Sequence, residues 1–352
     1  MRIHIIVAII AASLNIMAQD PMQCKKEWPG SERISSIAFS AEGKGYYGAG
    51  GTGNEWYHDL WEYDPVMDEW TEKESEVPIY NRIAFSIGDR GFLLCEDALF
   101  EYNPSADSWI ERASLPTYAT TDATIFVIDD CAYYGWQMSK YAKLYKYCAN
   151  TDSWTRIADF PGYARRFAST FVINGKGYVC GGWATHYNHS LNDLWEYDPI
   201  MDRWETKMSL GTDGFSFAFG TSIDNKGYVG NLKFDNGVVS DIIWQYDQAT
   251  NSWIEFKTTS ATAFHWDFDT FSICSKLYIV DSFKSCNLYE FDPLVCSTIC
   301  LRDRIISTNI SSCIVNSENV IIQGDVLIEF EEKFEATGTI NVPVGTTLII
   351  RP

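Results

Sequence analysis

The sequence lacks two features that would place the protein in a membrane or on nucleic acid. Beyond the first 18 residues, no apolar run is long enough to cross a bilayer. Positive charge is scarce, because 27 Lys and Arg face 47 Asp and Glu, which gives a formal net charge of −20. A chain this acidic is repelled by phosphate backbones and by anionic lipid surfaces. We therefore expect no transmembrane segment and no nucleic-acid partner.

Motifs for metal binding and nucleophilic catalysis are missing as well. Only five histidines occur, and the close pair His186 and His189 falls in an expected loop rather than on a helix that would aim both at one ion. Cys296 and Cys300 have no second Cys or His pair nearby in the sequence. No Gly-x-Ser-x-Gly segment or metalloprotease His pair is present. The sequence therefore predicts no metal site and no cofactor, and it singles out no catalytic residue.

Residues 1–18 have the pattern of a signal peptide. Arg2 supplies a positive start, Ile5–Ala12 is apolar, and Ala18 is a small residue that suits cleavage before Gln19. The segment is too short to span a bilayer, and no Leu-x-x-Cys lipid-attachment pattern ends it. We expect an exported protein, whether periplasmic, on the cell surface or secreted.

Aromatic residues, by contrast, are abundant and recur at regular intervals. They make up 15% of the chain, and a tyrosine precedes a tryptophan by seven positions in five places. These pairs are Tyr63 and Trp70, Tyr102 and Trp109, Tyr147 and Trp154, Tyr197 and Trp204, and Tyr246 and Trp253. The constant spacing predicts a hairpin whose turn fixes the register of two strands. Each copy has a further aromatic residue 10 to 19 positions before the first aromatic residue of the hairpin. A loop of variable length therefore separates this residue from the hairpin.

The pattern resembles the kelch repeat, in which a strand ending in Gly-Gly is followed by a spaced Tyr and a spaced Trp. The glycine pairs Gly50-Gly51 and Gly181-Gly182 belong to copies one and four. Neighbouring tryptophans are 39 to 50 residues apart, as expected for propeller blades. Six copies cover roughly residues 30–298, and we expect the aromatic columns and the glycine pairs to be structural.

The expected fold is all-β: a six-bladed kelch-type β-propeller over residues 19–300, with a short C-terminal β-strand tail over residues 301–352. Copy six has Thr298 where the Trp is expected, so the mature N-terminus is expected to supply the outer strand that completes this blade. Such closure removes exposed sheet edges. It would bring Cys24 near Cys296 or Cys300.

Ten cysteines follow the expected leader, and an exported chain is free to form disulfides. Two pairs bracket the variable loop of a single copy, so each is a candidate staple within one blade. These are Cys131 with Cys148 and Cys274 with Cys286.

One face of the propeller should carry every variable loop, because the loops after the second and fourth strands of a blade emerge on the same side. Ligand-binding candidates on that face are aromatic, histidine and arginine side chains: Trp56, Trp136, Trp183, His186, His265, Arg82, Arg165 and Arg166. Exposed aromatic rings beside Arg and His suit a sugar ring that carries an acidic group. The same loop aromatics can instead serve loop packing.

These features favour a non-catalytic, exported recognition module that binds a glycan or a protein through the variable-loop face. The resemblance also implies an enzymatic alternative, because kelch propellers include copper-radical galactose oxidases and sialic-acid epimerases. The ligand set of the copper enzymes does not map onto this chain, whereas a carbohydrate- or sialic-acid-modifying enzyme would have its site in the mouth of the channel. A structural spacer in a surface assembly is the third reading, since one fold hosts many functions.

Overall fold

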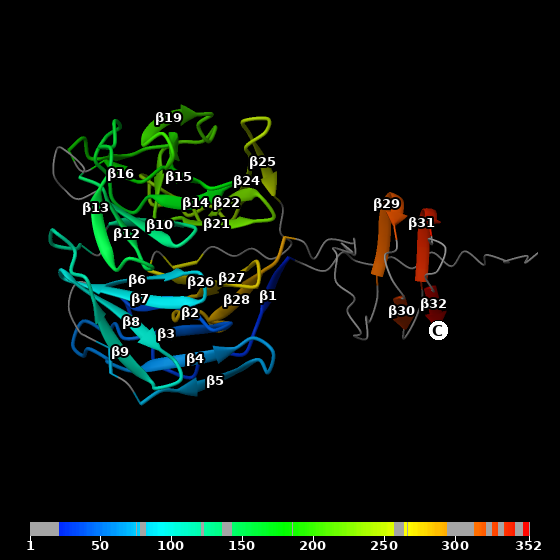
Figure 1. The fold of residues 1–352 in the computed structure, drawn as a ribbon, viewed down its shortest axis with the longest axis horizontal. Helices are drawn as coiled ribbons and strands as arrows, with labels where there is room; N and C mark the ends of the chain where they lie inside the picture. The colour runs from blue at the N-terminus through cyan, green and yellow to red at the C-terminus, as the bar shows by residue number, and fades with distance from the viewer. Residues whose placement is uncertain are drawn as a thin grey trace, which may run out of the picture. The chain divides into compact units, whose positions relative to one another are not determined.

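The computed structural model describes residues 21–74, 76–77, 82–120, 123–135, 143–184, 186–256, 264–265, 267–293, 313–321, 326–329, 334–341 and 348–351. The side chains of Arg82 and of the last four strands lie outside this description. All regular elements in these residues are β-strands apart from turns and bends (Figure 1). Within this part of the chain, no helix offers the length and apolar character that a bilayer crossing needs.

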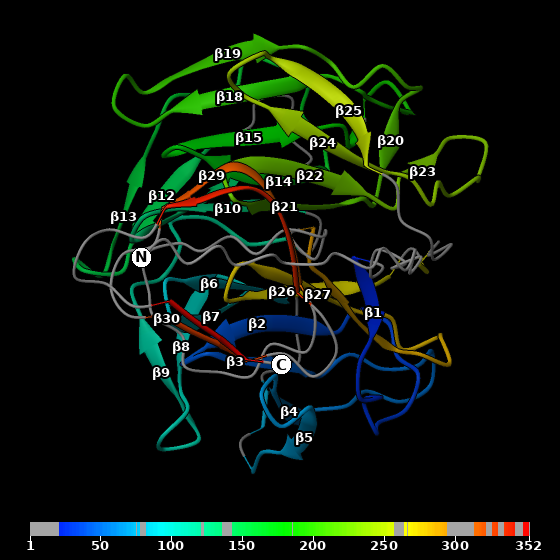
Figure 2. The ribbon, with the colours of Figure 1, turned by 90° about the vertical axis from the view of Figure 1, so that its right-hand side faces the viewer.

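Met22–Asp292 forms a propeller of six four-stranded antiparallel sheets, which confirms the expected fold (Figures 1 and 2). Blade 1 consists of β2 (Ile37–Ala41), β3 (Lys44–Gly48), β4 (Leu60–Asp64) and β5 (Glu69–Glu72). Blade 2 consists of β6 (Arg82–Ile87), β7 (Arg90–Cys95), β8 (Ala98–Asn103) and β9 (Ser108–Arg112). Blade 3 consists of β10 (Thr124–Ile128), β11 (Cys131–Gly135), β12 (Tyr145–Cys148) and β13 (Ser153–Arg156). Blade 4 consists of β14 (Ser169–Ile173), β15 (Lys176–Cys180), β18 (Leu194–Asp198) and β19 (Arg203–Lys207). Blade 5 consists of β21 (Phe219–Ile223), β22 (Lys226–Gly230), β24 (Ile243–Asp247) and β25 (Ser252–Phe256). Blade 6 consists of β26 (Asp269–Ile273), β27 (Lys276–Val280), β28 (Leu288–Phe291) and β1 (Met22–Cys24). The loops of blades 4 and 5 add two small sheets: β16 (Trp183–Ala184) with β17 (His189–Ser190), and β20 (Phe215–Ser216) with β23 (Lys233–Phe234).

The constant spacing of seven is a hairpin register, as the sequence predicted. In blade 4, Tyr197 lies opposite Trp204 across the β18–β19 hairpin, and the other four Tyr–Trp pairs have the same register. The turn ends at Asp202, whose φ of 48° places it in the left-handed region that Asp tolerates better than most residues. The Tyr197 hydroxyl donates to Asp202 Oδ1 at 2.7 Å, and the same oxygen accepts the Ala158 amide at 2.9 Å. Each hairpin therefore also holds the segment that leads in from the preceding blade.

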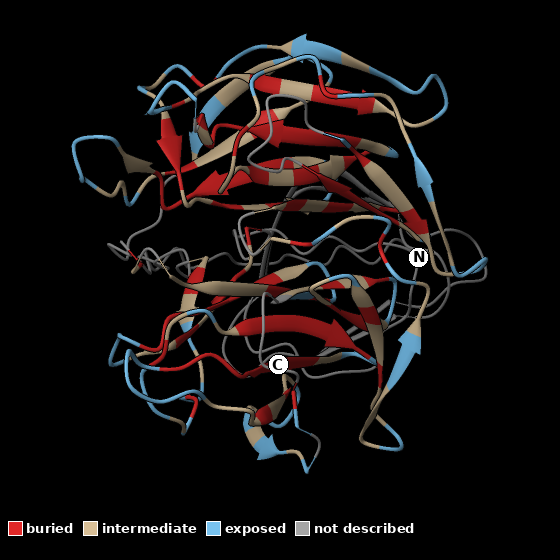
Figure 3. Cartoon of the chain, turned by 90° about the vertical axis from the view of Figure 1, so that its left-hand side faces the viewer, coloured by how far each residue is buried: buried red, intermediate tan, exposed pale blue. Residues whose placement is uncertain are grey.

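Aromatic side chains fill the space between neighbouring blades. The ring of Phe126 on β10 stacks on Tyr133 at 5.0 Å, and this pair packs against Tyr197 and Trp204 of the next blade. Gly177 makes room for the contact, since a Cβ there would lie 2.2 Å from the Phe126 ring. Six hydrophobic clusters of this kind follow the six interfaces around the ring, whereas the outer strands and turns are largely exposed (Figure 3).

The N-terminal strand closes the ring. Strand β1 pairs antiparallel with β28, with Met22 opposite Phe291, and so becomes the outer strand of blade 6. Cys24 forms a disulfide with Cys286 of the same blade. The predicted Cys274–Cys286 pair is therefore wrong, and Cys274 is an exposed free thiol in the opposite turn of the blade. Cys24 therefore does not pair with Cys296 or Cys300, which lie outside the described residues.

Within blade 3, the disulfide Cys131–Cys148 is present, as the sequence predicted. It joins residues that face each other across β11 and β12.

The glycine pair of blade 1 is shifted by one residue relative to the expected alignment. Tyr46 of blade 1 and Tyr178 of blade 4 occupy equivalent strand positions. Ala49 and Gly50 therefore correspond to Gly181 and Gly182. All four have a positive φ, of 54°, 79°, 64° and 95° respectively. Gly51 instead corresponds to Trp183, because each forms the same bridge with the segment that precedes the first strand. The turn therefore requires left-handed backbone but not two glycines.

The four strands beyond the propeller belong to a second unit. Strand β29 (Cys313–Ile321) pairs in parallel with β31 (Phe334–Asn341), and β30 (Val326–Glu329) pairs in parallel with β32 (Leu348–Arg351). Parallel pairing of alternate strands places successive segments above one another, as in the rungs of a solenoid.

Candidate ligand-binding site at the channel mouth

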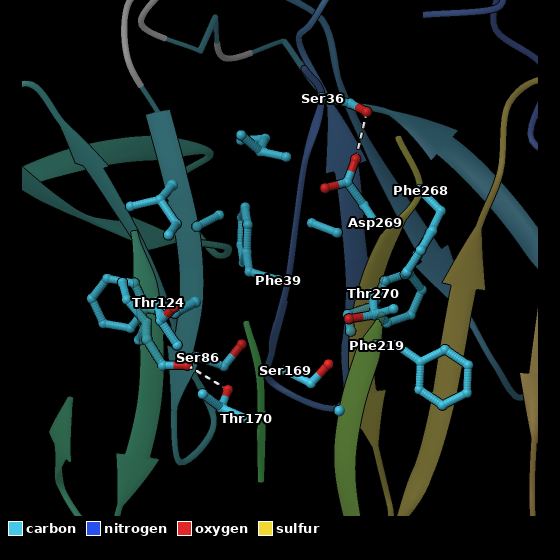
Figure 4. Close-up of a pocket in the computed structure, with 18 of the residues that line it drawn as sticks. Ser36, Phe39, Ser86, Thr124, Ser169, Thr170, Phe219, Phe268, Asp269 and Thr270 are labelled. Atoms are coloured by element: carbon cyan, nitrogen blue, oxygen red, sulfur yellow. Dashed lines mark hydrogen bonds between the residues drawn. The ribbon is translucent and has the colours of Figure 1, made fainter. Parts of the chain in front are cut away.

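The inner strands enclose a cavity of about 1190 Å³ along the axis of the propeller (Figure 4). It is bounded by β2, β6, β10, β14, β21 and β26, which carry many small or hydroxyl side chains where they face the axis. Several hydroxyls bind the backbone of a neighbouring blade: Ser86 Oγ accepts the Ser40 amide at 2.7 Å, and Thr170 Oγ1 donates to the Ile125 carbonyl at 2.8 Å. The floor of the cavity is thus part of the scaffold, and its distinctive chemistry lies at the mouth.

Aromatic rings dominate the mouth on the variable-loop side. Trp56, Phe167, Phe217 and Phe268 all line the cavity, and Trp56 is 53% exposed. The rings of Phe167 and Phe217 stack with their centroids 3.9 Å apart, and the Phe217 amide donates to the Phe167 carbonyl at 3.2 Å. Both residues have left-handed backbone, with φ of 56° and 53°. A bulky side chain in this region is strained, and such strain concentrates at binding sites.

Two cations flank the stacked rings. The Arg166 guanidinium lies 5.2 Å from the centre of the Phe167 ring, and the Lys233 ammonium lies 4.9 Å from that of Phe217. Cations over aromatic faces are attracted by the ring quadrupole. Arg166 and Lys233 thereby fix one side of the mouth as aromatic and positively charged.

Blade 6, the neighbour of blade 5, contributes an acidic wall. Asp267 and Asp269 both line the cavity, and Ser36 donates a hydrogen bond to Asp269 (Figure 4). Burial raises the pKa of the Asp267 carboxyl, and the negative charge of Asp281 adds to this effect. The hydrogen bond from the Ser35 amide to Asp267, at 3.0 Å, opposes the shift without cancelling it. Asp267 is thus a carboxyl group inside the cavity that binds its proton more tightly than an exposed aspartate does.

Arg165 has a structural position that the sequence interpretation did not anticipate. Its side chain is fully buried, and its guanidinium pairs with Asp193 through contacts of 2.5 and 2.8 Å. The remaining hydrogen bonds go to the carbonyls of Gly181 and Tyr163. Arg33 makes the equivalent contacts with Asp59 in blade 1. A ligand at the surface cannot reach Arg165, so the expectation that it contacts ligand is not met in this structure.

The other candidates are distributed unevenly over the face. Trp56 lines the cavity, and Arg166 borders it through Phe167. Trp183 is half-buried in β16 beside Arg166, and His186 is exposed next to Tyr187. His265 is half-buried near the acidic wall, where its Nδ1 accepts the Asp267 amide at 3.3 Å. Trp136 and the side chain of Arg82 lie outside the described residues.

Sequence reasoning missed Phe167, Phe217, Asp267 and Asp269, which all come from the starts of inner strands. A signal was present, because Ser35, Phe167, Phe217 and Asp267 occupy equivalent positions just before the first strand of their blades. Aligning those positions would have identified the column that faces the channel. Among the described residues, no group of three or more His, Cys, Asp or Glu is arranged to hold a metal ion.

Six four-stranded blades in a ring, five of them with a Tyr–Trp hairpin on the outside, define a kelch-type β-propeller. The kelch motif model matches residues 164–211, which include all four strands of blade 4. The solved structure entitled "Structure of YjhT" is similar, with a TM-score of 0.59 and 14% sequence identity over 77% of this chain and 96% of that chain. None of the curated proteins matches the sequence. Because 721 solved chains match the structure, the likeness shows the fold alone and does not select a function.

Proposed function

We propose that the protein is an exported, non-catalytic recognition module that binds a carbohydrate at the mouth of the propeller channel. A kelch propeller supports binding in general, and the chemistry of the mouth supports this ligand class. The observation that carries the proposal is a cavity of about 1190 Å³ whose rim combines Trp56 with the stacked Phe167 and Phe217. Aromatic faces pack on the C–H surface of a sugar ring, while hydroxyls and carboxylates such as Asp269 accept hydrogen bonds from its hydroxyl groups.

Export is supported by the two disulfides within the propeller, Cys24–Cys286 and Cys131–Cys148. Disulfides persist in oxidising compartments and are rare in the cytosol. Sequencing the N-terminus of the protein recovered from outside the cytoplasm tests the expected cleavage after Ala18. Recovery of the intact leader on a cytoplasmic protein would contradict export.

The ligand class is tested with a glycan array, using the full chain and its Trp56→Ala variant. Binding that falls at least tenfold in the variant supports a sugar site at the mouth. Tyr118→Ala is the matched control, because Tyr118 is 62% exposed and does not line the cavity. Failure of the unaltered chain to bind any glycan would overturn the carbohydrate proposal and leave a protein ligand or a spacer role to be tested.

One observation favours a second candidate, a carbohydrate-modifying enzyme. Asp267 lies in the cavity with a raised pKa, and groups that donate or accept protons in catalysis have this property. Incubating the array-selected sugar with the protein and recording its NMR spectrum tests for turnover. Conversion that is lost in Asp267→Asn while binding persists would replace the non-catalytic proposal.

A further inference from the structure

Blades 1 and 4 can be compared position by position, and this comparison separates side chains that serve the fold from side chains that do not. Blades 1 and 4 have the same backbone on the variable-loop face, since Ile34 bridges Gly51 as Arg166 bridges Trp183. The buried pairs Arg33–Asp59 and Arg165–Asp193 also coincide, and so do the indole hydrogen bonds of Trp61 and Trp195 to those aspartates. Residues that recur between the two blades therefore serve the fold.

Three positions on that shared backbone differ in a consistent direction. Where blade 1 has Ser31, Ser35 and Gly51, blade 4 has Tyr163, Phe167 and Trp183. The turn accepts small residues, because blade 1 makes it with them. The large aromatic side chains of blade 4 are consequently not required by the fold, and Phe167 is present despite its left-handed backbone.

These aromatic residues lie in the channel lining and just beyond it. Phe167 lies at the mouth, and Trp183 is held beside Arg166 by two backbone hydrogen bonds of 3.1 and 2.8 Å. The hairpin that starts with Trp183 then presents Tyr187, whose ring contacts Tyr163 with centroids 4.6 Å apart. Tyr163 and Tyr187 are each 51% exposed. We call Phe167, Arg166, Trp183, Tyr163 and Tyr187 the blade-4 strip.

The strip offers more than one aromatic surface, because Phe167 lines the cavity whereas the contacting rings of Tyr163 and Tyr187 do not. Its outer end is rigid, because the carbonyl of Tyr163 accepts a hydrogen bond from the buried Arg165 at 3.1 Å. The amide of Tyr187 donates to the Ala184 carbonyl at 3.0 Å. Pre-positioned rings lose little conformational freedom when a ligand stacks on them.

We infer that the blade-4 strip is a second subsite, and that the ligand is an oligosaccharide whose chain runs from the channel mouth outward over blade 4. The inference rests on the carbohydrate proposal and deepens it. One sugar unit occupies the mouth beside Trp56, and later units stack on Tyr163 and Tyr187. The exposed His186 and His189 border Tyr187 and add hydrogen-bonding groups for hydroxyls.

Chain-length dependence tests the second subsite. The probes are chito-, cello- and malto-oligosaccharides from monosaccharide to hexasaccharide, titrated by calorimetry against the full chain. Affinity should rise with length until the strip is covered. Tyr187→Ala should lower the affinity for the longer oligosaccharides about fivefold to tenfold and leave the affinity for the monosaccharide unchanged.

The variants separate this inference from the proposal on which it rests. Trp56→Ala should weaken every member of the series, while Tyr118→Ala should weaken none. Unchanged melting temperatures for Tyr187→Ala and Tyr163→Ala would show that both variants fold. Binding that does not depend on length, or that Tyr187→Ala weakens equally for short and long sugars, would overturn the second subsite alone. Absence of binding to any of the probes and to the wider array would overturn both.

Discussion

Blade 4 and blade 6 hold their variable loops by different chemistry. In blade 4, the loop begins with Gly181-Gly182 and is tied by the buried Arg165–Asp193 pair. In blade 6, Asp281 occupies the position of Gly181, and its carboxylate accepts the amides of His265 at 2.6 Å and Phe283 at 3.1 Å.

The outer edges of the two blades differ as well. Blade 4 ends in a strand with Trp204, which belongs to the same hairpin as Tyr197. Blade 6 borrows β1, and Asn287 binds the backbone of Trp28 with both its amide oxygen and its amide nitrogen, at 2.7 and 3.0 Å. The disulfide Cys24–Cys286 completes the attachment. The Tyr–Trp hairpin therefore holds the outer strand in blade 4. In blade 6, where the ring closes, a disulfide and the hydrogen bonds of Asn287 hold the outer strand instead.

The largest expected effect concerns the closing disulfide. Replacing Cys24 and Cys286 together by Ser should lower the free energy of unfolding by about 5 kcal/mol, because the bond closes a loop of 262 residues. The same change at Cys131 and Cys148, which closes only 17 residues, should cost about 3 kcal/mol. Urea unfolding of the two double variants measures both. Equal losses would show that ring closure has no special dependence on Cys24.

The next effect breaks the corresponding tie in blade 4. Arg165→Met should destabilise the propeller by about 3 kcal/mol, because Asp193 loses its partner in a largely buried site. Arg33→Met in blade 1 should cost a similar amount, since the same pair exists there. Arg156→Met, which removes an exposed ion pair, is the control and should change stability little. A loss for Arg165→Met no larger than for this control would contradict the structural assignment.

A smaller effect tests size matching between blades. Gly177 faces the Phe126 ring, while blade 6 has Leu277 at the equivalent position and blade 5 has Thr221 in place of the Phe. Gly177→Leu should destabilise by about 2 kcal/mol through overpacking. Adding Phe126→Thr recreates the combination found between blades 5 and 6, and the double variant should be more stable than the sum of the single changes predicts. Strict additivity, measured by urea unfolding, would contradict direct size matching.

The smallest expected effect is on the pH dependence of stability, which should be alike in blade 4 and blade 6. Burial favours the protonated forms of Glu196 and Glu290, but hydrogen bonds from Lys176 and Tyr178, and from Lys276 and Tyr278, outweigh it and hold both pKa values below the ordinary range. A depressed folded pKa stabilises the protein above the unfolded value of about 4.5, and this contribution is lost as pH falls through the folded pKa. Glu196→Gln and Glu290→Gln should each flatten the fall in melting temperature between about pH 5 and pH 3. An unchanged pH profile in either variant would contradict the assignment.

Much of the scaffold could be predicted because its determinants are local. The seven-residue step from Tyr197 to Trp204 sets one hairpin, and the same step in four other places sets the rest of the pattern. The role of Arg165 was missed, although the matching spacing of Arg33 after Trp28-Pro29-Gly30 marks it as part of the repeat. A side chain that recurs at the same position of different repeats has a structural role, even when its residue type suggests that it binds a ligand.

The channel mouth was harder to predict because it is assembled from residues far apart in the chain. Phe167, Phe217 and Asp267 come from three consecutive blades and meet only when those blades pack side by side. The repeat alignment identifies their position in each blade, but the side chains there differ from blade to blade, so no shared residue type marks the column. The partner of Cys286 was missed for the same reason, since the sequence favours the near Cys274 over Cys24.

The position of β1 has a consequence for the order of synthesis. Strand β1 (Met22–Cys24) is the first strand of the propeller to be made, yet its pairing partner β28 is among the last. Until then, the first and last blades each expose an aromatic face that later forms the cluster around Trp28, Tyr63 and Tyr278. The ring can therefore close only late, when the first strand of the propeller pairs with one of its last.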